Sequence, residues 1–349
     1  MTQKKQVSGL DKFFGVTAAG SSIKVEIMAG LTTFFAMAYI IFVNPNILNQ
    51  FYVITGDTAM ASAVASSVFV ATCLSAFIGT LLMAVYAKVP FAQASGMGLN
   101  AFFAYTVMLG NGYSYNQALA IVFISGLLFI LITLLGLREA IYRAIPKNVR
   151  IAISAGIGMF ITLIGLLNAG VVVKNDATTI GMCSFNVWNS ATAAALLCLL
   201  GLIIAGVLMK LKVKGAILWS ILGGAAVYYL LGLTIPGFYT DFFVGKSLNP
   251  FAAFAAFGSE SFGKVFTEGF DFSGYLAVEG HTIGSLVITF ATTSLAFCMV
   301  DMFDTLGTLY GACRGGNLLV KDKNGEETVP NMDRAMLADA IATCSGAVC

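Results

Sequence analysis

The chain has 349 residues, of which 58% are apolar and only 10% are charged, and its mean hydropathy is +0.88. This composition excludes a soluble or disordered protein, and a net charge of +2 without a basic stripe excludes a nucleic-acid groove. Seven cysteines without a CxxC pair and a single histidine exclude zinc sites and multi-histidine metal centres. We therefore expect an all-α, multi-pass protein of the lipid bilayer that uses no metal and no cofactor.

Long apolar stretches follow one another along the chain. A helix of about 20 mostly apolar residues crosses the hydrocarbon core of a bilayer. Eight stretches reach that length, and a ninth begins near Met336. The eight predicted spans lie at about 27–46, 62–87, 91–109, 116–137, 148–170, 190–209, 215–234 and 284–310.

The basic residues predict the orientation of these spans. All but three of the 19 Lys and Arg residues lie in the N-terminal segment or after the second, fourth, sixth and eighth spans. The three on the other side are Lys174, Lys246 and Lys264. Because cytoplasmic loops collect Lys and Arg, the N-terminus is expected in the cytoplasm, with the spans in the cell (plasma) membrane.

The longest outer connection contains the apolar-aromatic run FAAFAAF at 251–257, followed by several charged residues. This pattern is typical of a helix that lies in the membrane interface. His281 follows near the start of the eighth span, where a simple interfacial histidine is the expected reading.

Faint repeats link the two ends of the chain. VATC at 70–73 resembles IATC at 341–344, and GLTTFFAMAY at 30–39 resembles FATTSLAFCM at 290–299. If these are copies, the odd number of spans between them inverts the second copy in the membrane. Inverted repeats occur in many secondary transporters.

The third span begins with the unusual run PFAQASGMGLN at 90–100. Gly96 and Gly98 expose backbone, which a bilayer tolerates only where the backbone faces protein or a wet cavity. Small residues of this kind also allow close helix packing. Asn100 and the aromatic run at 102–105 favour instead a broken helix beside a planar ligand, because an amide can donate and accept and aromatic faces can stack.

The eighth span contains CMVDMFDTLGTLYG at 298–311. Asp301 and Asp304 are three residues apart and share a helix face, which Thr305 and Thr308 continue. A carboxylate at mid-membrane costs about 2.5–3.5 kcal/mol, so a pair of them indicates a function. The alternative is a carboxylate capped by neighbouring groups to hold helices together. Two adjacent buried carboxylates can hold and release a proton near physiological pH.

The last apolar run, from Met336 to Cys349, has 14 residues and would be about 21 Å long as a helix. That length is too short to cross a bilayer. Asp339 in this run is expected to be a helix-start residue near the inner interface. The sequence therefore predicts a chain that stops in mid-membrane and does not transport as it stands.

Four runs together resemble one transporter family. They are EIMAGLTTFFAMAYIIFVNP (26–45), ASGMGLNAFFAYTV (94–107), IPKNVRIAISAGIGMFI (145–161) and MVDMFDTLGTLYG (299–311). With these runs the chain resembles the nucleobase–cation (nucleobase–ascorbate) symporter superfamily, in the AzgA-like branch of adenine, guanine and hypoxanthine permeases. The resemblance implies a uracil-permease-like fold of two inverted seven-span repeats with broken third and tenth helices, here truncated in the ninth span. It also allows a homodimer.

On this resemblance the chain is organised into four parts. They are a cytoplasmic N-terminal segment (1–25), a first seven-span repeat (26–235), an outer loop with an interfacial helix (236–283) and an incomplete second repeat (284–349).

The resemblance further implies import of a purine nucleobase with protons. Asp301 is then the principal substrate carboxylate and Asp304 the proton-coupling group. The other substrate-binding residues are Asn100, Gly98, Phe102 and Thr305. We expect the third helix to break around 96–100, with Asn100 turned toward the eighth span. The family's further glutamate, in the tenth span, has no counterpart here.

Three other functions remain to be compared with purine transport. An anion carrier of the same fold would use basic or neutral groups, which Asp301 and Asp304 disfavour. An intramembrane aspartyl protease needs its two aspartates on separate helices, whereas these share one turn. A cation channel can use acidic rings and is harder to exclude. The broken third span near an amide and aromatic side chains fits a closed site for an organic ligand better.

Overall fold

The structure, a computed structural model, describes most of the chain. The described residues are 9–14, 16–17, 22–137, 147–175, 178–213, 216–234, 250–277, 280, 282–315, 318–321 and 327–349. The chain divides into two compact units, the first made of Met1–Ser154 with Pro250–Cys349 and the second of Ala155–Asn249.

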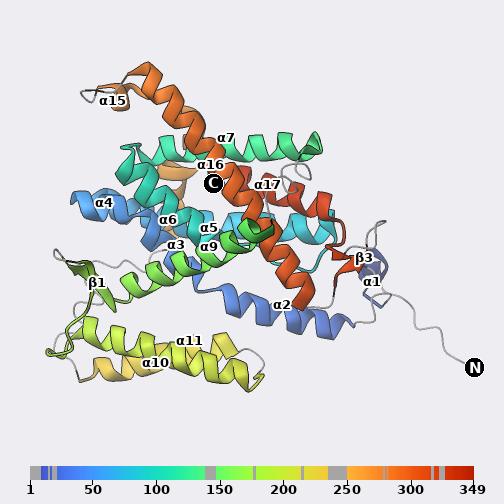
Figure 1. The fold of residues 1–349 in the computed structure, drawn as a ribbon, viewed down its shortest axis with the longest axis horizontal. Coiled ribbons are helices and arrows are strands. Elements are labelled where there is room, and N and C mark those ends of the chain that lie inside the picture. Colours follow the sequence, from blue (N-terminus) through green and yellow to red (C-terminus); the bar gives the residue numbers. More distant parts are fainter. Residues whose placement is uncertain are drawn as a thin grey trace, which may run out of the picture. The chain divides into compact units, whose positions relative to one another are not determined.

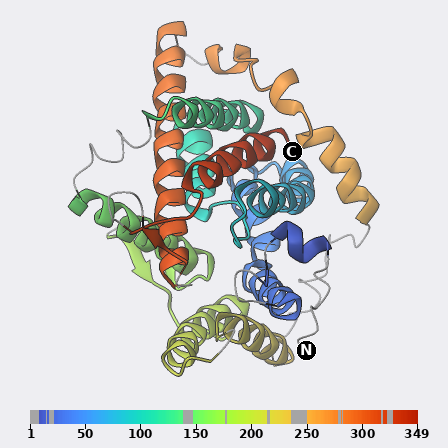
Figure 2. The same cartoon turned by 90° about the vertical axis from the view of Figure 1, so that its right-hand side faces the viewer.

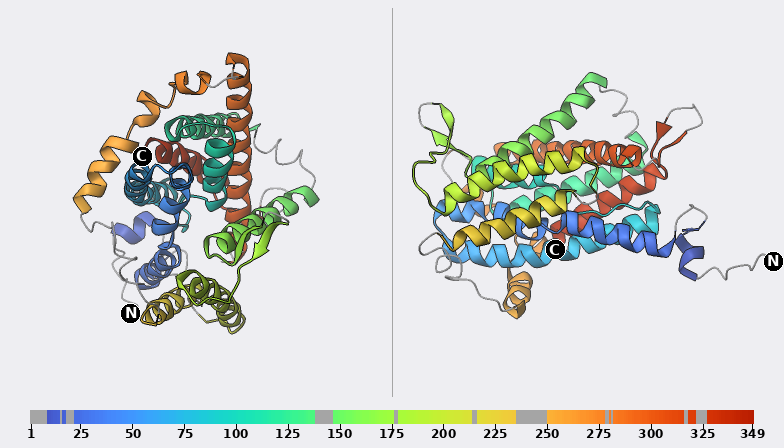
Figure 3. Two further views of the ribbon diagram at one scale, coloured as in Figure 1. Left: turned by 90° about the vertical axis from the view of Figure 1, so that its left-hand side faces the viewer. Right: turned by 90° about the horizontal axis from the view of Figure 1, so that it is seen from below.

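The first unit is almost entirely helical (Figure 1). Its elements are α1 (Gly9–Phe14), α2 (Ile23–Met37), α3 (Ile40–Leu48), α4 (Gln50–Thr55), α5 (Thr58–Leu82) with the π-helical η1 (Met83–Ala87), α6 (Met97–Ala101) with the π-helical η2 (Phe102–Gly110), α7 (Tyr115–Leu134), α13 (Pro250–Ala256) with the π-helical η3 (Phe257–Ser261), α14 (Lys264–Thr267), α15 (Ser273–Leu276), α16 (Ile283–Gly315) and α17 (Met332–Val348). A short antiparallel hairpin, β3 (Val320–Lys321) with β4 (Glu327–Thr328), lies between α16 and α17 (Figure 3).

Helix α9 (Lys147–Asn168) begins in the first unit and continues into the second. The second unit also contains an antiparallel hairpin and two helices. In the hairpin, β1 (Val172–Asn175) pairs with β2 (Thr179–Met182), and Val172 lies opposite Met182. The helices α10 (Ser190–Lys210) and α11 (Ala216–Gly232) pack together, and the Ser220 hydroxyl donates to the Gly201 carbonyl at 2.9 Å.

Local sequence signals explain where the long helices of the first unit begin. The Asp57 side chain accepts a hydrogen bond from the backbone N–H of Met60 at 3.0 Å and caps α5. Ser114 and Gln117 form a reciprocal capping box at the start of α7. Such caps satisfy N–H groups that a helix end leaves open, a need that is greatest where water is scarce.

The end of the chain packs into the centre of the first unit. Helix α17 lies against both α7 and α5, α16 lies against α7, and α3 lies against α5 (Figure 2). An apolar core joins residues from α5, η2 and α7, among them Val68, Met108 and Ile121. Since lipid tails are as apolar as these side chains, close packing rather than water exclusion holds such helices together.

The contact between α7 and α17 depends on one glycine. A Cβ added to Gly126 would lie 2.6 Å from the sulfur of Cys344 and 3.3 Å from its backbone nitrogen. We expect Gly126→Ala to force the helices apart and cost about 1–3 kcal/mol, with Cys344→Ala on top restoring part of the loss.

Thermal unfolding of the purified full-length protein in detergent measures this effect. The matched control is Gly311→Ala in α16, where an added Cβ has nothing within 4 Å. Equal midpoints for Gly126→Ala and Gly311→Ala would show that the close approach of α7 and α17 is absent.

Four helices in the described part of the chain are long and apolar enough to cross a membrane. They are Thr58–Ala87, Tyr115–Leu134, Ser190–Lys210 and Ile283–Arg314, and they match the predicted second, fourth, sixth and eighth spans. Large apolar side chains such as Phe77, Leu131 and Ile288 are exposed on these helices. That exposure is costly in water and suits lipid.

Two predicted spans are interrupted. The first, expected at 27–46, is divided by a turn at residues 38–39 into α2 and α3. The third, expected at 91–109, is non-helical from 88 to 96 and helical from Met97. The interruption therefore precedes the expected break at 96–100, because Pro90 lacks an N–H group and the backbone of Gln93 bonds instead to the Thr80 side chain in α5.

Candidate functional site

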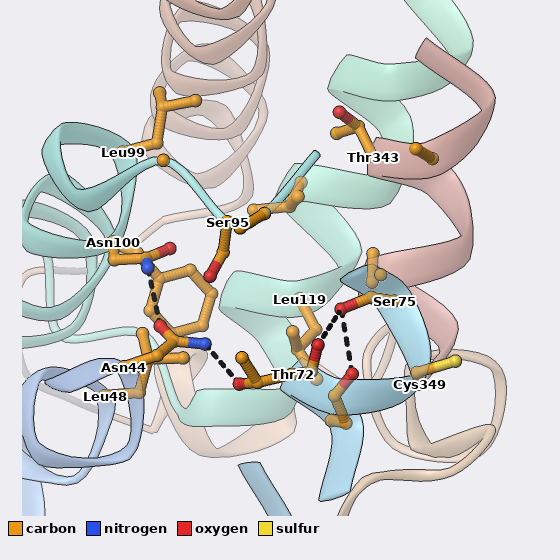
Figure 4. A pocket seen from close by; sticks show the side chains of 18 of the residues that line it. Asn44, Leu48, Thr72, Ser75, Ser95, Leu99, Asn100, Leu119, Thr343 and Cys349 are labelled. Carbon is orange, nitrogen blue, oxygen red and sulfur yellow. Dashed lines mark hydrogen bonds between the residues drawn. The ribbon is translucent and has the colours of Figure 1, made fainter. Parts of the chain in front are cut away.

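A cavity of about 200 Å³ lies inside the first unit (Figure 4). It is lined by α3, α5, the non-helical stretch 93–96, α6, η2, α7, α16 and α17. Aromatic side chains of Phe103, Tyr115 and Phe297 line part of it. The helices thus surround a small chamber that combines apolar walls with a few polar groups, as ligand sites do.

One wall of the cavity is a chain of hydrogen-bonded side chains. The hydroxyl of Thr72 donates to the Val68 carbonyl at 2.6 Å, and Nδ2 of Asn44 donates to Oγ1 of Thr72 at 2.6 Å. Nδ2 of Asn100 in turn donates to Oδ1 of Asn44 at 2.5 Å. Asn44 is 4% exposed and Thr72 is 2% exposed, so the bond between them is shielded from solvent, which strengthens it.

Another wall is acidic. Oδ2 of Asp301 in α16 accepts a hydrogen bond from the Thr343 hydroxyl of α17 at 2.9 Å. Oδ1 of Asp339 accepts one from Nε2 of Gln93 at 2.6 Å, and the Thr305 hydroxyl donates to Oδ2 of the same carboxylate. Both carboxylates line the cavity, and none of its described lining residues is basic.

Two polar atoms at the cavity have no partner within the described structure. Oε1 of Gln93 and the hydroxyl of Ser95 are buried there without a hydrogen bond. Buried polar atoms in folded proteins are nearly always paired. These two atoms are therefore candidate hydrogen-bond partners for a polar ligand in the cavity.

Asp304 lies outside the cavity, next to the start of α6. A Cβ added to Gly96, the residue that precedes α6, would lie 3.6 Å from Oδ2 of Asp304. The open N–H groups and the dipole at a helix start favour a negative charge. The two acidic residues of the eighth span thus differ in position, since Asp301 faces the cavity and Asp304 faces α6.

The structure brings two of the residues expected to bind substrate to the cavity, Asp301 and Asn100. Gly98, Phe102 and Thr305 are not among its lining residues. Phe102 packs edge-on against Phe297, with ring centroids 4.9 Å apart, because it points into the core between helices. Thr305 acts on the cavity only through its bond to Asp339.

Asn100 is oriented differently from the expectation. Its amide donates to Asn44 in α3, whereas we expected it to turn toward the eighth span. The reason is that α3 and α6 lie side by side, and the buried Asn44 offers the acceptor that the Asn100 amide needs.

Several residues of the cavity were not predicted from the sequence. The reading of Asp339 as a helix-start residue is wrong, because α17 begins at Met332 and Asp339 lies two turns inside it. The faint repeat gave an unused signal: Thr72 and Thr343 are the third residues of VATC and IATC. Both line the cavity, and each holds one polar residue there, Asn44 or Asp301.

Apolar helices of membrane-spanning length around a buried polar chamber define a multi-pass membrane protein. Residues 24–349 match the model of the Permease family, Xan_ur_permease. The chain belongs to this family, the nucleobase–ascorbate transporter family.

Three relatives illustrate the similarity. The chain is 37% identical to the "Putative permease MJ0326" of Methanocaldococcus jannaschii, over 97% of this chain and 67% of the relative. It is 35% identical to the "Guanine/hypoxanthine permease PbuO" of Bacillus subtilis, over 94% and 66%. It is 33% identical to the "Adenine permease AdeQ" of Escherichia coli, over 97% and 66%. The chain thus spans about two thirds of the length of these relatives, which by their names are transporters rather than enzymes.

Proposed function

We propose that this chain carries the binding site of a secondary transporter that imports purine nucleobases together with protons. The observation that carries the proposal is the cavity with an acidic wall, an amide wall and aromatic side chains. Its volume of about 200 Å³ is below the roughly 300–1,000 Å³ of pockets for drug-sized ligands. A single nucleobase is smaller than a drug-sized ligand and therefore suits a cavity of this volume. The relatives above include permeases named for guanine, hypoxanthine and adenine.

The polar groups of the cavity suit the edges of a purine. A purine presents N–H donors and ring-nitrogen acceptors around a flat apolar body. The carboxylates of Asp301 and Asp339 and Oε1 of Gln93 can accept from its N–H groups, and the Ser95 hydroxyl can donate to a ring nitrogen. Phe103 and Phe297 can contact its faces. An anion carrier would use basic or neutral groups, whereas this cavity is lined by the carboxylates of Asp301 and Asp339.

The inverted-repeat architecture forms part of the same proposal. One of the two echoes supports it, because the pair VATC and IATC puts one threonine of each copy at the cavity, where Thr72 contacts Asn44 and Thr343 contacts Asp301. A two-fold related pair of repeats meeting at mid-membrane is how many secondary transporters build their substrate site. We propose accordingly that 26–235 is the first repeat and 284–349 belongs to the second, with residues 1–25 in the cytoplasm.

We propose that the connection at 236–283 includes an interfacial helix. Phe251 and Phe254 of α13 are 80% and 61% exposed, as expected for rings that enter the headgroup region. Residues 235–249 lie outside the described residues, and so does His281.

Purine binding to the purified full-length protein tests the proposed function. Isothermal titration with adenine, guanine and hypoxanthine should give saturable binding of at least one of them. Heats indistinguishable from dilution with all three would contradict the proposal.

The position of Asp304 gives a prediction about coupling. Because Asp304 lies beside Gly96 and does not line the cavity, Asp304→Asn should change purine affinity less than about threefold, well under the effect of losing one charge-assisted hydrogen bond. Accumulation of purine against a gradient should be lost, since an amide cannot carry a proton.

Binding and proton-driven uptake are measured on the same variant in proteoliposomes. Thr308→Val, which changes a neighbouring residue on the same face of α16, is the control and should leave both intact. Full concentrative uptake by Asp304→Asn would remove this residue from the coupling mechanism.

A further inference from the structure

The hydrogen bonds that link Asn100, Asn44 and Thr72, the amide wall of the cavity, all point the same way, and the backbone of α5 fixes that direction. The hydroxyl of Thr72 has one proton, and it donates that proton to the Val68 carbonyl at 2.6 Å. Toward Asn44, therefore, Oγ1 of Thr72 can only accept. Asn44 must turn its NH₂ group to Thr72, and its carbonyl oxygen then faces the opposite way.

Asn44 fixes the orientation of Asn100 in the same way. Oδ1 of Asn44 can only accept, so Asn100 must present its NH₂ group there, and it does so at 2.5 Å. The carbonyl oxygen of Asn100 is then the end left for the cavity. Figure 4 shows that this oxygen points away from Asn44 and toward the side on which Ser95 lies.

We propose that Asn44 and Thr72 are positioning residues that lock the carbonyl oxygen of Asn100 toward the cavity as a hydrogen-bond acceptor. The site then selects nucleobases that present an N–H donor to Asn100 and rejects those that present a ring-nitrogen acceptor at the same place. This inference rests on the proposed function, because it names the specificity of the same site.

An unsupported asparagine would not discriminate in this way. Its amide can rotate by half a turn and offer either its oxygen or its NH₂ group, so it suits both kinds of ligand edge. Rotation of Asn100 would set its oxygen against the oxygen of Asn44 and leave two buried lone pairs without a proton. A site whose polar groups cannot adapt rejects the wrong ligand strongly.

Two purines can distinguish a fixed Asn100 carbonyl from an amide that rotates freely. Hypoxanthine carries an N–H at ring position 1 and a carbonyl at position 6, whereas adenine carries a bare nitrogen and an amino group at these positions. Competition by each against labelled guanine, measured on the full-length protein in membranes, gives a ratio of inhibition constants that does not depend on how much protein folds.

Thr72→Val removes the hydroxyl and keeps the shape, so Asn44 and Asn100 become free to rotate. We expect the ratio of inhibition constants to differ from one by about tenfold or more in the wild type, the scale of one misplaced hydrogen bond. In Thr72→Val it should move toward one by about the same factor. Thr72→Ser, which keeps the hydroxyl, should retain the wild-type ratio.

Asn44→Leu tests the same inference by a second route, since it removes the partner that orients Asn100. The matched control is Thr133→Val in α7, whose hydroxyl makes the same kind of bond, to the Phe129 carbonyl at 2.8 Å, away from the cavity. It should keep the wild-type ratio.

A wild-type ratio near one, or a ratio unchanged in both Thr72→Val and Asn44→Leu, would contradict the inference that Asn44 and Thr72 fix the orientation of Asn100. Purine binding itself would be unaffected by that result. Failure of every purine to bind the wild type would be a different result, because it would contradict the proposed function itself.

Discussion

Replacing Asp301 by asparagine is expected to weaken purine binding by tenfold to more than a hundredfold. The substitution keeps the shape of the side chain but replaces one carboxylate oxygen by an NH₂ group. That group would face either an N–H of the ligand or the hydroxyl of Thr343, which donates to Oδ2 at 2.9 Å. Charge-assisted hydrogen bonds contribute about 1.5–3 kcal/mol each, which sets the expected range.

Isothermal titration of the purified full-length protein measures this loss. Thr343→Val keeps the carboxylate and removes one donor to it, so it should weaken binding less than Asp301→Asn does. Asp333→Asn, which changes an exposed acidic residue in the first turn of α17, serves as the control. Unchanged purine affinity in Asp301→Asn would refute the substrate role of Asp301.

Replacing Asp339 by alanine is expected to give the largest loss of stability. Its carboxylate joins the non-helical stretch 88–96 to α16 and α17, because it accepts from Gln93 at 2.6 Å and from Thr305. Alanine would leave both donors without an acceptor in the interior of the first unit. Each unsatisfied buried donor costs about 1–3 kcal/mol, so a total of about 2–6 kcal/mol is expected.

The unfolding midpoint in detergent measures the cost. A triple variant with Asp339→Leu, Gln93→Leu and Thr305→Val should recover much of it, because removal of both partners of a hydrogen bond is far less costly than removal of one. Because the Asp339 carboxylate lines the cavity, purine binding should be lost in Asp339→Ala and should not return in the triple variant. An Asp339→Ala midpoint equal to that of the wild type would contradict the central place of this carboxylate.

Composition and apolar run length predicted the class of protein. Such runs cannot encode how a helix is interrupted: residues 37–41 read MAYII, all of them compatible with a continuous helix, yet the chain turns there between α2 and α3. The non-helical start of the third span was visible in part, since Pro90 and the glycines mark it. Its exact extent depends on Thr80 of a neighbouring helix.

The candidate site was predictable where a residue is conspicuous by itself. Asp301 and Asn100 are polar residues at membrane depth, and both line the cavity. Gln93 and Asp339 acquire their importance only from each other, across 246 residues of sequence. No local pattern contains such a contact. Asn44, next to a proline in an apolar run, was equally hidden.

Counterflow tests most directly whether the cavity binds a purine and carries it across the membrane. Proteoliposomes that contain the full-length protein are loaded with unlabelled adenine, guanine or hypoxanthine and diluted into labelled purine of the same kind. We expect a transient, saturable accumulation of label that depends on the internal purine and is abolished by Asp301→Asn. Flux that does not saturate and is indifferent to the internal purine, or accumulation that persists in Asp301→Asn, would contradict this role of the cavity.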